Sequence, residues 1–375
     1  MKLSNYIPIS FCLLYLCMSV SGFSQKQADS LLTIANKLVY ENPDKAIEIA
    51  SGVLEHKETP VKYKISALLS LSTSYSSKRD YEKSLEYVLL VTDYLSEIKD
   101  DKQKMNILNR IGGQYQDLKI YDKAIDYLDE ALVLIESYPR QDSIQTYLGY
   151  NAILRGFIYR EQMSCEIALK YFDKAIEAYQ QTLSNPIMNA NVSICYYNQG
   201  NCLLSLDNME AAETSYVKSI IHADRIDAPS LIAFAEKGLA EIKTREGKYP
   251  EAIIILNGAL DKAEHVGDLI LNRGLYEGLS NNYLALNDWE NYTLFRDKYL
   301  TLQKETKISE RKSINQSLWN ITVERADEIE QLHRWYTPLE ILLICLTILS
   351  FIFLIRFIIR SERSLKNLEN KLKNN

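Results

Sequence analysis

One pattern of small and aromatic residues recurs along the chain, and it constrains the fold more than any other feature. In the clearest copy, Gly112 and Tyr115 precede a turn, and Tyr121, Ala124 and Leu128 follow it. The equivalents of the small residue after the turn lie 38 to 44 residues apart, at Ala46, Ser84, Ala124, Ala168, Ala212 and Ala252, with a weaker copy centred on Tyr292. A period of this length indicates a stack of similar supersecondary units.

The composition favours helical units. The chain has 13 glycines and 8 prolines in 375 residues, well below the usual shares of about 7% and 5%. A β-sandwich, a barrel or a Gly-rich nucleotide-binding fold needs more turn residues than this. The sequence therefore predicts an all-α fold.

These repeated residues resemble the tetratricopeptide repeat family. The resemblance covers about six units within residues 25–303, each of them longer than the standard unit of about 34 residues. It implies a right-handed superhelical stack of antiparallel helical hairpins. The first helix of each hairpin would line a concave face, and the small residues would let paired helices approach closely.

The N-terminal residues 1–24 are typical of a secretory signal peptide. Lys2 precedes a short apolar stretch from Ile7 to Val20, and the small residues Gly22 and Ser24 follow it. The alternative is a membrane anchor that is not removed. We favour cleavage because the apolar stretch is short for a span.

A second apolar segment, residues 336–359, is predicted to be a transmembrane helix. Its apolar part, from Leu339 to Ile359, is about 20 residues long, enough to cross a bilayer. Trp335 and Tyr336 lie where an interfacial aromatic belt forms, and Pro338 suits the first turn of a helix. The tail, residues 360–375, has five basic and two acidic side chains. The positive-inside rule therefore predicts a single-pass inner-membrane protein with a cytoplasmic tail and a periplasmic repeat domain.

Residues 304–335 read as one charged juxtamembrane helix with an apolar stripe at spacings of three and four. The stripe consists of Ile308, Ile314, Leu318, Ile321, Ile329 and Leu332. It either caps the last repeat or pairs with a partner helix to form a dimer. We favour capping.

No motif for chemistry is present in the sequence. His56, His222, His265 and His333 are scattered without metal-ligand spacing and read as surface residues. No nucleophile elbow or phosphate-binding loop occurs. The net charge of −6 argues against direct nucleic-acid binding. We predict a non-enzymatic protein without a cofactor.

Three cysteines remain in the repeat domain once the signal peptide and membrane span are set aside. Cys195 and Cys202 are seven residues apart on one helix, so their Cα atoms are about 10.5 Å apart, too far for a disulfide. Cys165, Cys195 and Cys202 read as small buried apolar residues. A Cys165–Cys202 bridge remains an open alternative.

Partner-binding residues follow from the repeat register. The first helices present Asn109, Phe157, Arg160, Tyr197 and Asn201 to the expected concave face. Their mixture of aromatic and polar groups suits a protein or peptide partner. The alternative is that they are ordinary groove residues without a cognate ligand.

The order of segments resembles the extracytoplasmic sensor half of tetratricopeptide-type regulators and histidine kinases of Bacteroidetes-like bacteria, without their output domain. The sequence therefore predicts a membrane-anchored extracytoplasmic scaffold or sensor that mediates protein–protein interaction. The alternative is a truncated signal-transduction regulator whose tail engages a cytoplasmic histidine kinase or a DNA-binding transcription factor.

Overall fold

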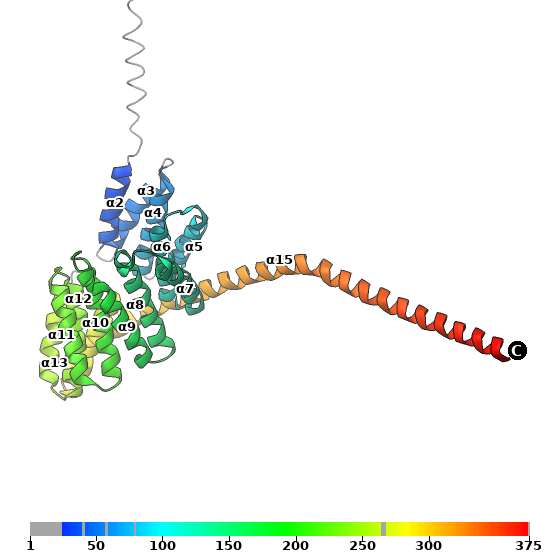
Figure 1. The fold of residues 1–375 in the computed structure, drawn as a ribbon. Helices are drawn as coiled ribbons and strands as arrows, with labels where there is room; N and C mark the ends of the chain where they lie inside the picture. Colours follow the sequence, from blue (N-terminus) through cyan, green and yellow to red (C-terminus); the bar gives the residue numbers. More distant parts are fainter. Residues whose placement is uncertain (1–24, 40–41, 57–58, 79, 264–267, 374–375) are drawn as a thin grey trace, which may run out of the picture. The chain divides into compact units, whose positions relative to one another are not determined.

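The fold was analysed in a computed structural model that describes residues 25–39, 42–56, 59–78, 80–263 and 268–373. Among these residues the regular structure is entirely helical, as predicted (Figure 1). The helices are α2 (Gln25–Leu38), α3 (Pro43–Glu55), α4 (Val61–Ser77), α5 (Tyr81–Thr92), α6 (Asp101–Asp117), α7 (Tyr121–Ser137), α8 (Gln145–Gln162), α9 (Cys165–Gln180), α10 (Met188–Ser205), α11 (Met209–Asp224), α12 (Pro229–Arg245), α13 (Tyr249–Ala263), α14 (Leu269–Ala285) and α15 (Trp289–Lys373), with short 3₁₀ turns at Leu95–Glu97 and Gln141–Ser143. The chain divides into two compact units, Met1–Asn315 and Gln316–Asn375, each described by itself.

The first unit is a stack of antiparallel helical hairpins, each made of an even-numbered helix and the helix that follows it (Figure 1). The predicted fold class is therefore confirmed. Helix α2 supplies the first helix of the N-terminal unit, for which the sequence showed only a half-copy at α3. The start of α15 completes the last hairpin, because the Phe295 ring packs against Tyr276 and Tyr283 of α14.

A common turn joins the two helices of several hairpins. Its central residue has a positive φ, near 60° at Lys119, Asp207 and Asn287 and 75° at Gly247. After this residue the next backbone N–H donates to a carbonyl five residues back, as in Ile120 to Tyr115 at 2.9 Å. This bond is the helix-ending arrangement that usually employs glycine. Here it forms mainly with non-glycine residues, which explains how hairpins close in a glycine-poor chain.

Close approach of the paired helices is confirmed at the repeated glycines. A Cβ atom on Gly156 would lie 2.5 Å from the Phe172 ring, and one on Gly112 would lie 2.9 Å from Leu128. The small residues after the turn, including Ala124, are fully buried. In the hairpins α6–α7, α8–α9 and α10–α11, a large side chain of the second helix therefore packs directly over a glycine of the first helix.

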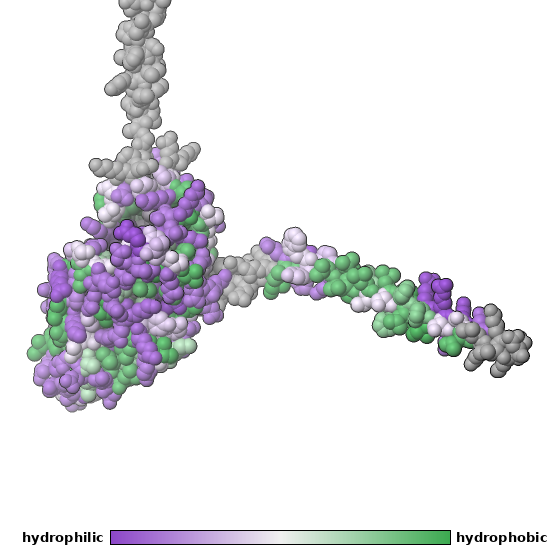
Figure 2. Space-filling view, viewed as in Figure 1, coloured by the Kyte–Doolittle hydropathy of each residue, from purple (hydrophilic) through white to green (hydrophobic). Residues whose placement is uncertain are grey.

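The C-terminal unit is part of one continuous helix. The predicted juxtamembrane and transmembrane segments both lie within α15, and Pro338 lies inside it rather than in a first turn. The expectation for Pro338 was wrong because the charged residues before it are helical too. Among the described residues, one helical segment, Ile329–Asn367, is long and apolar enough to cross a membrane. Figure 2 shows this hydrophobic stretch along α15.

Two expectations concern residues that the structure does not describe. The signal peptide, residues 1–24, lies outside the described residues, as do the side chains of Ile314, Leu318 and Ile321. Of the predicted stripe, Ile308, Ile329 and Leu332 are described, and each is more than half exposed. Ile308, the one of these that belongs to the first unit, is therefore not buried against the last repeat. Thr306, just before them, is buried and accepts a hydrogen bond from Arg273 of α14 at 2.6 Å.

Candidate partner-binding surface

Asn109 is buried and is not part of any surface. Its side chain is fully buried, its amide donates to the Tyr147 carbonyl at 2.9 Å, and its Oδ1 accepts from Asn151 at 2.8 Å. The prediction that Asn109 lies on the concave face is therefore wrong, because its side chain is buried. The repeat register could not reveal this, because a polar residue on a first helix can face the solvent or the neighbouring unit equally well.

Phe157 and Arg160 lie together on the C-terminal half of α8. The Arg160 guanidinium lies over the Phe157 ring, 5.9 Å from its centroid. It donates to Asn198 of α10 at 2.5 Å and to Glu161 at 3.1 Å, and the Arg160 side chain keeps 30% of its surface exposed. The guanidinium thus links two neighbouring first helices and still reaches solvent.

Tyr197 and Asn201 lie one turn apart on α10. The half-buried Tyr197 ring packs against two other rings. Its centroid lies 6.2 Å from that of Tyr216 of α11 and 5.4 Å from that of Phe234 of α12. The Tyr216 hydroxyl donates to Asn201 Oδ1 at 2.8 Å. Burial raises the pKa of Tyr216, so this hydroxyl stays protonated and can serve as the donor.

Two of the predicted residues lie on α8 and two on α10, and the hydrogen bond from Arg160 to Asn198 links these two helices. We call the set formed by Phe157, Arg160, Tyr197, Asn201 and Phe234 the α8–α12 surface. The sequence reading did not include Phe234. The repeat signal could have found it, because Phe234 lies 37 residues after Tyr197, close to one repeat length. Among the described residues, the Tyr197 hydroxyl makes no hydrogen bond.

The surface has no catalytic or metal-binding arrangement in the part of the chain that the structure describes. No group of three His, Cys, Asp or Glu side chains there could hold a metal ion.

The sequence suggested that His222 is a surface residue, but its side chain is half-buried. Its Nδ1 is 2.8 Å from Asn189 Oδ1, and its ring stacks on Tyr196. Cys165, Cys195 and Cys202 are free thiols in this structure.

Residues 194–220 match the family model of the tetratricopeptide repeat. This segment spans most of α10 and α11 and includes Tyr197, Asn201 and Tyr216. The resemblance to the tetratricopeptide repeat family is thus confirmed by this repeat and by the fold. No curated protein is similar to this chain at a significant level.

Two solved structures have folds similar to that of this chain. One is NprR in complex with its cognate peptide NprX, with a TM-score of 0.56, 15% sequence identity, and coverage of 86% of this chain and 95% of that chain. The other is a signal-transduction ATPase with a tetratricopeptide repeat sensor from Pyrococcus horikoshii, with a TM-score of 0.55, 15% identity, and coverage of 76% of this chain and 43% of that one. At this identity the likeness establishes the fold alone.

Proposed function

We propose that this chain is a membrane-anchored extracytoplasmic scaffold or sensor that binds a protein or peptide partner on the α8–α12 surface, which we take to lie on the concave side of the stack. The observation that carries the proposal is the Tyr197 ring. It is held between Tyr216 and Phe234 while its hydroxyl makes no hydrogen bond with any described residue. A rigid aromatic ring with an available polar end is well suited to recognise another chain.

Neighbouring groups extend the same chemistry. Arg160 is oriented by Phe157 and Asn198 but keeps part of its guanidinium in solvent, and Arg is enriched at binding hot spots. Asn201 is fixed by the Tyr216 hydroxyl. These side chains are oriented before a partner arrives, which lowers the entropic cost of binding. The peptide in the NprR complex makes a peptide a natural class of partner for this fold.

Crosslinking in the native envelope tests the surface. The wild-type chain should capture a defined set of partners, and Arg160→Glu and Tyr197→Ala should lose them. Tyr197→Phe keeps the ring packing and removes only the hydroxyl, so it separates recognition from folding. Lys170→Glu, an exposed charge reversal on α9, is the matched control. If the surface variants capture the same set as wild type, the proposal for the α8–α12 surface is wrong.

Membrane anchoring rests on the apolar segment within α15 and its basic flank. Arg360, Arg363 and Lys366 follow the apolar run and are all exposed, the position expected on the cytoplasmic side. A reporter that is active only in the cytoplasm should be active when it is fused after Asn375. The mature protein should begin at Gln25 when its mass is measured. A periplasmic reporter signal would overturn the orientation.

A further inference from the structure

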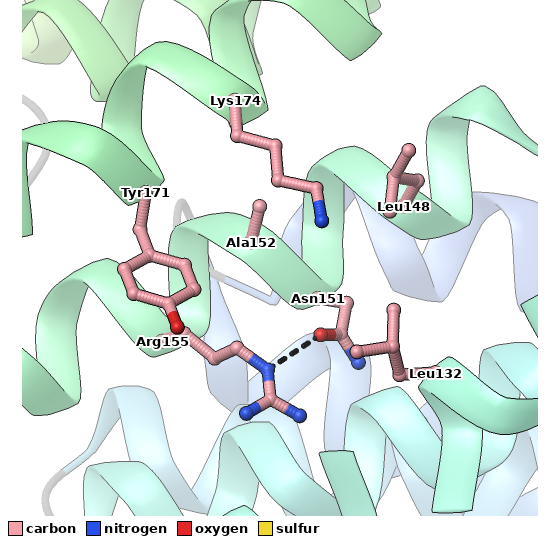
Figure 3. A pocket seen from close by; sticks show the side chains of 7 residues that line it. All are labelled: Leu132, Leu148, Asn151, Ala152, Arg155, Tyr171 and Lys174. Atoms are coloured by element: carbon pink, nitrogen blue, oxygen red, sulfur yellow. Dashed lines mark hydrogen bonds between the residues drawn. The ribbon is translucent and has the colours of Figure 1, made fainter. Parts of the chain in front are cut away.

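A small cavity lies away from the α8–α12 surface, between α7, α8 and α9 (Figure 3). Its volume is about 80 Å³, space for a group of a few heavy atoms, since a water molecule occupies about 30 Å³ in the liquid. The lining residues are Leu132, Leu148, Asn151, Ala152, Arg155, Tyr171 and Lys174. Two of these seven are cations and none is an acid.

The floor of the cavity is a rigid polar chain. Asn151 donates to Asn109 Oδ1 and to the Leu128 carbonyl, both at 2.8 Å, which uses both of its amide hydrogens. Its Oδ1 accepts from Arg155 Nε at 2.8 Å. With every group of Asn151 engaged, the Arg155 guanidinium is held in one orientation.

Arg155 is the unusual member of this chain because it is a nearly buried cation. Only 7% of its side chain is exposed, and its single acidic partner is Asp129, at 2.5 Å from Nη2, itself 60% exposed. A guanidinium has five N–H donors. Nε and Nη2 are engaged, whereas Nη1 makes no hydrogen bond to any described residue. Nη1 is not among the fully buried, unpaired atoms of the described residues, so this donor edge is open to water or to an acceptor in the adjacent space.

Two side chains of α9 complete the cavity. Lys174 makes no ion pair or hydrogen bond with any described residue, and Figure 3 shows its ammonium group pointing into the cavity. Tyr171 also lines the cavity, and its ring packs on Tyr159 with ring centroids 4.8 Å apart. Donors from two helices thus converge on one small space.

We propose that this cavity binds a carboxylate group on a short apolar stem. Arg155 and Lys174 offset by Asp129 leave one net positive charge, which matches a carboxylate better than a doubly charged phosphate. Arginine binds carboxylates through strong charge-assisted hydrogen bonds. The apolar walls formed by Leu132, Leu148 and Ala152 suit the stem.

The carboxylate can belong to a free small acid or to a glutamate side chain of a peptide, and the test distinguishes the two. Isothermal titration calorimetry of the full-length protein in nanodiscs would use propionate, with propionamide as the neutral isostere. A second pair of probes is the peptide acetyl-Ala-Glu-Ala-amide and its Gln counterpart. Binding of propionate alone supports a free acid, and stronger binding of the Glu peptide supports a peptide partner.

The variant Lys174→Met removes one cation without disturbing any described contact. It should weaken binding by about tenfold or more, the loss expected for a charge-assisted contact. Lys170→Met, an exposed lysine on the same helix that does not line the cavity, should bind like wild type, as should Arg160→Glu on the α8–α12 surface. The proposal is overturned if neither acid binds, if propionamide binds as well as propionate, or if Lys174→Met binds like wild type.

Discussion

The clearest quantitative prediction concerns Tyr216, a fully buried ring that lies between two glycines of neighbouring helices. A Cβ atom on Gly200 of α10 would lie 2.6 Å from the ring, and a Cβ atom on Gly238 of α12 would lie 2.4 Å from the same ring. Favourable carbon contacts occur at about 3.5–4.0 Å. Gly200→Ala therefore forces an overlap of about 1 Å that the ring cannot relieve by moving toward Gly238.

The magnitude follows from two opposing terms. Overpacking a buried site costs about 1–3 kcal/mol, and the upper end applies because the ring is confined on both sides. Alanine recovers about 1 kcal/mol of helix propensity over glycine. Gly200→Ala should thus lower the free energy of unfolding by about 2 kcal/mol.

Gly52 of α3 is the matched control, because no atom lies within 4 Å of a Cβ added there. Gly52→Ala should therefore stabilise the protein by up to about 1 kcal/mol. Urea unfolding followed by circular dichroism gives the global change. Stacked repeats can unfold in segments, so hydrogen exchange of peptides from α10 to α12 should locate the loss.

A double-mutant cycle with Tyr216→Leu tests the cause. With the ring removed, the penalty of Gly200→Ala should fall by more than 1 kcal/mol, the size expected for residues in direct contact. The reasoning is refuted if Gly200→Ala is as stable as Gly52→Ala, or if its penalty is unchanged by the loss of the ring.

Three further predictions can be checked on the same protein. Asn109→Ala should cost about 1–3 kcal/mol in a thermal-unfolding assay, since it removes the buried acceptor of Asn151, and partner capture by the surviving folded protein should be unchanged. Burial, with a smaller effect of Arg225, lowers the pKa of His222 in the folded protein. The unfolded chain therefore binds the proton more readily than the folded chain. The free energy of unfolding should fall as the pH drops below about 6.5, the ordinary histidine pKa, toward the lower pKa of the folded state. His222→Gln should weaken that dependence in pH-series melting curves, and equal dependence would contradict it. Burial raises the pKa of Cys195, so its thiol should resist iodoacetamide at pH 8 until urea is added, as read by mass spectrometry.

Local patterns were sufficient to predict the helical hairpins. The repeated small residues are buried against large ones, as at Gly112 and Leu128, because three successive hairpins share the same local packing. The turn residues Lys119, Asp207 and Asn287 gave no such signal. Their left-handed backbone is stabilised by the hydrogen bonds that close each hairpin. Asp207 and Asn287 tolerate this conformation, whereas a lysine such as Lys119 has no preference for it.

The candidate surface was only partly predictable. Arg160 and Tyr197 could be chosen from the repeat register. In the structure they lie on the neighbouring helices α8 and α10, which are linked by the hydrogen bond from Arg160 to Asn198. Asn109 carries the same signal, yet it is buried against the next unit. The direction of a side chain depends on how adjacent repeats rotate against one another, and that rotation is a sum of many contacts between distant residues.

The sequence by itself determined the helical class, the repeat and the apolar C-terminal segment, because each of these depends on residues close together along the chain. Tertiary structure alone decided which polar residues face a neighbour or the solvent. It buried Arg155 beside Asp129 and brought Lys174 of the next helix to the same cavity. Those three residues come from three different helices, and only the packing of the helices makes them into one site.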